Sequence, residues 1–455
     1  PQSSGIGGGA FMVHYDASTG EVNVYNGRER APMGADENLF INPETGQPYP
    51  YVEAWRSGLS TGAPGAVAML HMAHADHGQL DWADNFSFAI DLAENGFEVA
   101  PRLNSISQRM AGFTDMEETG VAAGYLFDET GEAWPVGHVL TNPDYADSLR
   151  LIAADWRNFY EGDLARAIVA AVNEAPRLGY LSEEDLAAYE PVKVSALCSP
   201  YRDHQICSAP PPASGGIAVG AILGMLEQFD MSANGPETAD GWALFIEASR
   251  LAYADRDHYV GDTDFVDVPV EGLLDRDYLA SRAQLINPQQ AIAEVSHGTP
   301  PGAEDRPEDA TDDRPGTSHF VVMDADGDVV SMTTTVESPF GSGRMVGGFF
   351  LNNQLTDFSF VARDEEGRLL PNAVQPGKRP RSSMSPTIVL DANGDFELAT
   401  GSPGGNSIIA YTAKSLVGML DWGLSPEDAA ALPNVVARGD TVNIEEGFDE
   451  AIMAE

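Results

Sequence analysis

The segment from residue 296 to residue 336 constrains the fold more than any other, because the chain changes character within it. Residues 296–316 are rich in Pro, Gly, Asp and Glu without apolar periodicity, which predicts an exposed, mobile loop. Residues 319–324 and 329–336 have strand composition and flank a turn containing Asp-Gly, which predicts a buried β-hairpin. Thr317 therefore lies where an acidic loop meets a hairpin, and a self-cleaving precursor would place a new N-terminal nucleophile there.

The chemistry of threonine explains why its position at this junction matters. A threonine hydroxyl is a weak nucleophile that needs a neighbouring base, and an N-terminal α-amine with a pKa of about 8 can be that base for its own side chain. A peptide nitrogen cannot, so Thr317 becomes competent only after the Gly316–Thr317 bond is cut. The hydroxyl itself is a plausible agent of that cut, through an N-to-O acyl shift. The alternative is that Thr317 merely begins a strand.

A second candidate element is the glycine pair Gly404-Gly405, which follows a predicted strand at 396–400 and precedes a predicted helix from about 407 to 420. Backbone N–H groups at a helix N-terminus favour anions, and glycine allows a ligand to approach them closely. Aimed at a scissile carbonyl, these groups would form an oxyanion hole. By itself the pair is equally consistent with a tight turn.

The charge balance excludes several classes of partner. The formal net charge is −45, and lysine occurs only at Lys193, Lys378 and Lys414. A charge of this sign repels nucleic acid and anionic membranes, so we expect neither as a partner. We interpret it as a solvated surface suited to high salt. No apolar run is long enough to span a bilayer.

The two cysteines and the clustered histidines are candidates for a disulfide and for a metal site, respectively. Predicted strands at 192–199 and 205–209 flank a tight turn near residues 202–203, which would place Cys198 opposite Cys207 and allow a disulfide suited to an exported protein. His71, His74 and His77 repeat at a spacing of three, which drifts around a helix, so we predict no metal site there. No cofactor is expected.

Length leaves the domain organisation open between two ordinary domains and one large layered domain. The sequence starts without a Met or a signal peptide and stops without a clear terminator, so we expect a removed leader or a fragment.

Motifs in fixed order along the whole chain resemble the gamma-glutamyltransferases, members of the N-terminal-nucleophile hydrolase superfamily. The matching segments are Pro1-Gln2-Ser3 with Gly5-Ile6-Gly7-Gly8-Gly9, Arg28-Glu29, Pro210-Pro211-Pro212 with Ser214-Gly215-Gly216, Tyr253-Ala254-Asp255-Arg256, Thr317-Ser318-His319-Phe320, Leu351-Asn352-Asn353-Gln354, Lys378-Arg379-Pro380 with Ser382-Ser383-Met384, and Gly401-Ser402-Pro403-Gly404-Gly405.

The resemblance implies a four-layer αββα sandwich, with a large subunit over residues 1–316 and a small subunit over 317–455 that looks truncated at its C-terminus. It implies that Thr317 attacks the γ-amide of glutathione or a related compound, and that the γ-glutamyl ester passes to water or to an amino acid or peptide acceptor. It implies a heterodimer of two chains from one precursor, in the periplasm or secreted. It also implies that Thr335 activates Thr317 and that the oxyanion hole is formed by Gly404 and Gly405. The donor's α-carboxylate would be held by Arg28, Ser382 and Ser383. Its α-amine would be held by Glu337, Gln354 and Asp357.

Physical chemistry supports this division of roles. A carboxylate suits the fork geometry of Arg28, and an ammonium needs acceptors such as Glu337 and Asp357. Position 337 is Glu where some family members have Asn, and Glu should still bind an ammonium. Residues 361–377 lack the aromatic of members with a lid, so we expect a more open site in which hydrolysis exceeds transpeptidation. The alternatives are a glutaryl or cephalosporin-type acylase of the same superfamily, and an unprocessed binding protein without activity.

Overall fold

Two antiparallel sheets form the centre of the molecule. The computed structural model describes residues 2–114, 120–175, 177–307, 309, 311 and 316–454. One sheet has the strand order β5 (Val192–Ser195), β2 (Glu21–Asn26), β1 (Gly9–Asp16), β9 (Val329–Thr335), β8 (Ser318–Met323). The other has the order β13 (Phe396–Thr400), β12 (Thr387–Leu390), β7 (His204–Ser208), β6 (Leu197–Tyr201). All pairings within both sheets are antiparallel.

Alternation of side chains along the strands explains why the sheets stack. Phe11 and Val13 of β1 point to one face, where they meet Cys207 of β7 and Ile388 of β12 in the core between the sheets. Met12, on the opposite face of β1, packs instead in the cluster that contains α2 (Ala66–His77).

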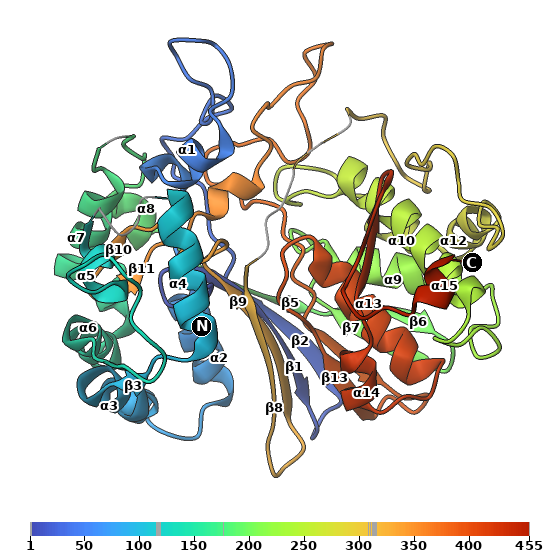
Figure 1. Cartoon of the computed structure of the whole chain (residues 1–455), viewed down its shortest axis with the longest axis horizontal. Helices are drawn as coiled ribbons and strands as arrows, with labels where there is room; N and C mark the ends of the chain where they lie inside the picture. The colour runs from blue at the N-terminus through green and yellow to red at the C-terminus, as the bar shows by residue number, and fades with distance from the viewer. Residues whose placement is uncertain are drawn as a thin grey trace.

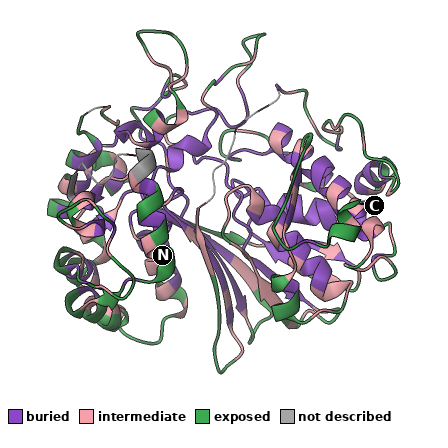
Figure 2. Ribbon diagram, in the orientation of Figure 1, coloured by how far each residue is buried: buried purple, intermediate pink, exposed green. Residues whose placement is uncertain are grey.

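Helices cover the outer face of each sheet (Figure 1). On one side lie α1 (Tyr51–Trp55), α2, α3 (Ser87–Asn95), α4 (Pro101–Thr114), α5 (Gly120–Leu126), α6 (Pro143–Ala154), α7 (Gly162–Val172) and α8 (Glu183–Ala187). On the other lie α9 (Gly215–Leu226), α10 (Ala239–Tyr259), α12 (Arg276–Ala283), α13 (Ser407–Leu420), α14 (Pro426–Ala431) and α15 (Glu450–Ala454). Buried residues concentrate in the sheets and in the helices that face them (Figure 2). The predicted αββα arrangement is therefore confirmed.

The remaining elements are short. They are the helix α11 (Val270–Leu273), the strand pairs β3 (Phe97–Glu98) with β4 (Val139–Leu140), β10 (Met345–Val346) with β11 (Phe349–Phe350) and β14 (Val435–Arg438) with β15 (Thr441–Ile444), and 3-10 turns at Gly58–Ser60, Trp82–Phe86, Trp156–Phe159 and Gln354–Asp357.

The two predicted subunits are interleaved within both sheets. Strands β1, β2 and β5 precede residue 316, whereas β8 and β9 of the same sheet follow it. In the other sheet, β6 and β7 come from the first segment and β12 and β13 from the second. A cut between residues 316 and 317 would therefore leave two chains joined by two shared sheets and a common core.

The prediction of a buried hairpin is only half right. Strand β9 is largely buried, but β8 forms the edge of its sheet, and the side chains of residues 320–323 are 42–61% exposed. Strand composition alone cannot distinguish an edge strand from a central one, because both use the same β-branched and aromatic residues.

The predicted loop over residues 296–316 is less exposed than its composition suggests. Pro307, Asp309 and Thr311 are buried. The Asp309 carboxylate lies 3.0 Å from the guanidinium of Arg381. An ion pair formed in the folded state can bury a charge that composition would place in solvent. The mobility of this loop stays a prediction.

Candidate active site

The pairing of β8 with β9 brings the predicted nucleophile to its predicted partner. Ser318 lies opposite Thr334, so the preceding Thr317 reaches the end of β9 at Thr335. The Thr317 hydroxyl donates to the Thr335 hydroxyl oxygen at 3.1 Å. That oxygen also accepts from the backbone N–H of Glu337 at 2.8 Å. Thr335 is therefore held in place and in turn orients the Thr317 hydroxyl.

The peptide between Gly316 and Thr317 is tightly enclosed. A β-carbon built on Gly316 would lie 1.6 Å from the Glu337 carbonyl oxygen, so only glycine fits at this position. The φ angle of Thr317 is 85°, in a left-handed region that β-branched residues rarely adopt. Such a conformation costs on the order of 1–3 kcal/mol, which cleavage of the preceding bond would release.

The glycine pair before α13 faces the same peptide. The Gly404 N–H donates to the Gly316 carbonyl oxygen at 2.9 Å. The φ angles of Gly404 and Gly405 are 139° and 58°, both in the region that favours glycine. A backbone N–H of the glycine pair therefore bonds to the carbonyl of the peptide at the predicted cleavage site, and the role of the pair as an oxyanion hole stays a prediction.

A small cavity of about 20 Å³ adjoins these groups. Every residue predicted to act in catalysis or substrate binding lines it, except Gly404. Met384, named above only as part of a motif, and Ile408, which no motif includes, complete its wall.

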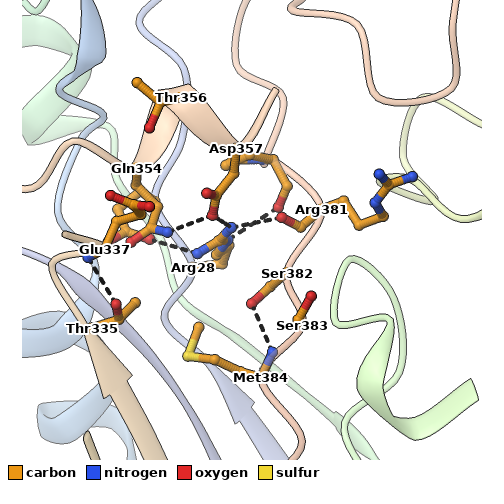
Figure 3. Close-up of polar contacts among 12 residues, drawn as sticks. Arg28, Thr335, Glu337, Gln354, Thr356, Asp357, Arg381, Ser382, Ser383 and Met384 are labelled. Atoms are coloured by element: carbon orange, nitrogen blue, oxygen red, sulfur yellow. Dashed lines mark hydrogen bonds and ion pairs between the residues drawn. The ribbon is translucent and has the colours of Figure 1, made fainter. Parts of the chain in front are cut away.

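Arg28 is the cation of this cavity and is completely buried. Its Nε donates to the Pro380 carbonyl at 3.0 Å, and its Nη2 donates to the Arg381 carbonyl at 2.7 Å and pairs with the Asp357 carboxylate at 2.6 Å. Figure 3 shows the guanidinium between Asp357 and the segment that carries Ser382 and Ser383. Its buried Nη1 has no hydrogen-bond acceptor among the residues that the structure describes.

Acceptors for a cation lie beside Arg28. Gln354 and Asp357 share one 3-10 turn, and the Gln354 amide donates to the Asp357 carboxylate at 2.6 Å. The buried Gln354 Oε1 receives no hydrogen bond within the described part of the chain. The Glu337 carboxylate accepts from Ser338 and Asn353. Two buried atoms of these side chains therefore lack a hydrogen bond within the described residues: Arg28 Nη1, whose ion-pair contact with Glu29 is 3.6 Å long, and Gln354 Oε1.

Burial also shifts the pKa values of two neighbouring groups. It raises the pKa of the fully buried Glu29 carboxyl to about 8, although the Arg28 guanidinium 3.6 Å away opposes this shift. It lowers the pKa of His319 to about 4, so this histidine is neutral near pH 7. The His319 ring bonds to the Thr333 hydroxyl at 3.0 Å, beneath Gly401. Neither group was predicted to act, because their importance comes from burial and not from a local pattern.

The remaining predicted groups lie away from the cavity. Cys198 is directly opposite Cys207 across the β6–β7 hairpin, and the two are joined by a disulfide. The rings of His71 and His74 pack against Trp82. Within the described ranges, no group of three His, Cys, Asp or Glu side chains is arranged to hold a metal ion. In the same ranges we find no helix of sufficient length and hydrophobicity for a transmembrane span.

Comparison with known proteins gives matches over the full length of the chain. The model of the family described as gamma-glutamyltranspeptidase matches residues 1–455. The glutathione hydrolase proenzyme of Bacillus subtilis strain 168 is 33% identical over 100% of this chain and 77% of its own length. The glutathione hydrolase proenzyme of Escherichia coli K12 is 35% identical over 98% of this chain and 76% of its own. The crystal structure of cephalosporin acylase from Bacillus halodurans superimposes with a TM-score of 0.84 at 27% identity, covering 99% of this chain and 79% of that one.

Proposed function

The chain belongs to the gamma-glutamyltranspeptidase family, and from this premise we propose that Thr317 is the nucleophile of both its self-cleavage and its turnover. The protein is an autoprocessing enzyme that acts on the γ-glutamyl amide bond of glutathione-type compounds and matures into two chains. One observation supports the assignment of the site most strongly. The cavity that contacts Thr317 is lined by Arg28, whose Nη1 donates no hydrogen bond within the described residues, and by Gln354, whose Oε1 accepts none there; a donor and an acceptor are what an α-amino acid head group requires.

Self-cleavage starts from the enclosed peptide. The Thr317 hydroxyl oxygen attacks the Gly316 carbonyl carbon, and the Gly404 N–H, already 2.9 Å from the carbonyl oxygen, stabilises the oxyanion that forms. The carbon–nitrogen bond breaks, the proton of the hydroxyl passes to the nitrogen, and Gly316 becomes an ester of the Thr317 side chain. Water then hydrolyses this ester, leaving a carboxylate on Gly316 and a free α-amine on Thr317.

Turnover uses the same hydroxyl with the new amine as its base. The hydroxyl attacks the γ-carbonyl of the donor, the oxyanion is held by the backbone N–H groups of Gly404 and Gly405, and the amine product leaves. The γ-glutamyl ester of Thr317 is then cleaved by water, or by the amine of an amino acid or peptide. Thr335 keeps the hydroxyl oriented, as it does in the uncleaved chain.

The donor head group is held by the two sets of side chains around Arg28. Its α-carboxylate binds Arg28, Ser382 and Ser383. Its α-ammonium binds Glu337, Gln354 and Asp357. Because Arg28 and Asp357 already form an ion pair, the donor adds one charge of each sign to a neutral pair, which keeps the buried site balanced.

Three finer assignments belong to the same proposal. Glutathione is the donor, and water is preferred over amine acceptors because residues 361–377 contain no aromatic side chain that could close over the ester. The enzyme acts in the periplasm or outside the cell, as the disulfide between Cys198 and Cys207 suggests.

A denaturing gel with N-terminal sequencing tests the assignment of Thr317. The purified wild type should give two bands, with Thr317 at the start of the smaller chain, and should hydrolyse a γ-glutamyl anilide. Thr317→Ala should remain a single band without activity. A Thr317→Ala protein that matures, or an intact wild-type chain that turns over the anilide at full rate, would refute it.

The resemblance in structure to a cephalosporin acylase makes an acylase the second candidate. A glutaryl donor lacks the α-amine, so it would supply no hydrogen-bond donor to the buried Gln354 Oε1. We therefore expect the γ-glutamyl anilide to be hydrolysed much faster than the glutaryl anilide, and the reverse order would favour the acylase.

A further inference from the structure

Arg256 lies behind the wall of the cavity formed by Ser382 and Ser383, outside the residues that line it. We propose that Arg256 is a positioning residue, which holds both serines in the orientation that receives the donor's α-carboxylate. The inference rests on the proposed function, because it takes from there the place of the carboxylate at these serines.

The contacts of Arg256 are those of a fixed support. The side chain projects from α10, is completely buried, and uses each of its three nitrogens. Its Nη2 donates to the Ser383 hydroxyl at 2.7 Å, its Nε donates to the Ser214 hydroxyl at 2.9 Å, and its Nη1 pairs with Asp257 at 2.7 Å. A rigid planar fork bonded at three points fixes its neighbours better than a flexible ammonium could.

Ser214 extends this support to Ser382. The Ser214 hydroxyl and backbone N–H donate to the Ser382 carbonyl at 2.8 and 2.7 Å. The Ser382 N–H donates in turn to the Pro212 carbonyl at 2.9 Å, so the segment before α9 and the serine segment form a short parallel bridge. Arg256 thus holds Ser383 directly and Ser382 through Ser214. This gives a role to two motifs, at 210–216 and 253–256, that otherwise have none.

The direction of these hydrogen bonds matters for substrate binding. A guanidinium can only donate, so the Ser383 oxygen accepts from Arg256. Donation from a cation to this oxygen polarises the O–H group of Ser383 and strengthens a hydrogen bond that the group donates. Arg256 therefore prepares Ser383 as a donor without touching the substrate.

The positive charge of Arg256 contributes less to binding of the donor's α-carboxylate than its hydrogen bonds do. The Asp257 carboxylate 2.7 Å from Arg256 offsets part of the charge of Arg256, and it also pairs with Arg438 at 2.8 Å and lies 3.7 Å from Arg381. Arg28 remains the cation that contacts the cavity. The expected consequence of losing Arg256 is therefore a misdirected hydroxyl, which weakens recognition of the α-carboxylate more than any other step.

Two donors that differ only in this carboxylate provide the test. We would measure kcat/KM, per processed molecule, for the γ-glutamyl anilide and for the 4-aminobutyryl anilide, which has the same amine and amide but no α-carboxylate. The wild type tests the proposed function, because it should strongly prefer the γ-glutamyl compound. Arg256→Lys tests the inference: the γ-glutamyl value should fall roughly 10- to 100-fold, mainly through KM, as expected for hydrogen bonds to a charged group. The 4-aminobutyryl value should change less than about threefold.

A matched control comes from the same helix. Arg250 is also a buried arginine of α10, but it bonds to Glu247 and to the Gly439 carbonyl, away from the cavity. Arg250→Lys should leave the preference between the two donors unchanged. An equal loss on both donors in Arg256→Lys, or an equal change of preference in Arg250→Lys, would overturn the inference.

Coupling to the serines gives a second, independent measurement. In a Ser383→Ala background, Arg256→Lys should lower the preference for the γ-glutamyl donor by much less than it does in the wild type. Ser214→Ala, which removes one hydroxyl and leaves Arg256 in place, should lower that preference by a smaller factor, and it serves if Arg256→Lys fails to fold. Undiminished loss in the Ser383→Ala background, or an unchanged preference in Ser214→Ala, would show that Arg256 does not act through these residues.

Discussion

Replacement of Gly316 by alanine should slow self-cleavage severely. The new methyl carbon would lie 1.6 Å from the Glu337 carbonyl oxygen, and these atoms must move apart by about 1.4 Å to reach the 3.0 Å that real β-carbons require. Both are attached to backbone, so the movement displaces the Gly316 carbonyl from the Gly404 N–H that it contacts at 2.9 Å. Loss of one oxyanion donor costs about 10²- to 10³-fold in rate, or roughly 3–4 kcal/mol, and we expect a decrease of that size.

The measurement is the fraction of uncleaved chain on a denaturing gel as a function of time after purification. Gly235→Ala is the matched control, because its methyl group meets open space and its backbone is not in the left-handed region. The processed fraction of Gly316→Ala should hydrolyse the γ-glutamyl anilide at a nearly normal rate, since Gly316 does not line the donor cavity. Processing of Gly316→Ala within about threefold of the wild-type rate would refute the argument from the enclosed carbonyl.

Two further variants test the surroundings of the nucleophile. Thr335→Val keeps the shape of the side chain but removes the oxygen that accepts from the nucleophile's hydroxyl, so maturation and kcat should both fall roughly 10- to 100-fold on a gel and in the anilide assay. Burial raises the pKa of Glu29 to about 8, so this carboxyl should ionise above pH 8 and compete with the donor's carboxylate for Arg28. The KM for the donor should therefore rise above pH 8 in the wild type but not in Glu29→Gln. The folded chain binds this proton more tightly than the unfolded chain, so the free energy of unfolding should fall as pH rises from about 4.5 to 8, and denaturant titrations of Glu29→Gln should lack that fall.

Elements decided by neighbouring residues were predictable from the sequence. The helix after Gly404-Gly405 was expected at about 407–420 and is found at Ser407–Leu420, because glycine and the apolar spacing that follows it mark its start locally. The two-residue turn between β6 and β7 sets the register that places Cys198 opposite Cys207. The position of Thr317 at the head of a strand was read from an abrupt change in composition, and β8 begins at the next residue.

Features decided by tertiary contacts were not predictable. Asp309 lies in a segment that composition assigns to solvent, yet it is buried because Arg381, 72 positions later, supplies its counter-charge. Arg256 could be recognised as part of a motif, but not as a support for Ser383, since nothing local relates positions 256 and 383. The neutral state of Glu29 depends equally on packing from distant elements, because burial is the largest cause of its raised pKa.

On our proposal the uncleaved chain is the first substrate of its own active site. The surrounding residues therefore divide into those that act in both self-cleavage and turnover and those that act in turnover alone. The Gly316 carbonyl already bonds to the Gly404 N–H, so it occupies the place that the γ-carbonyl of a donor takes later. Thr335 contacts the hydroxyl that both reactions use, and Gly404 contacts the carbonyl that this hydroxyl attacks first, whereas the side chains of Arg28 and Gln354 hydrogen-bond to other groups within the described residues. Changes to the first pair should therefore slow maturation and turnover together, while changes to the second pair should slow turnover alone.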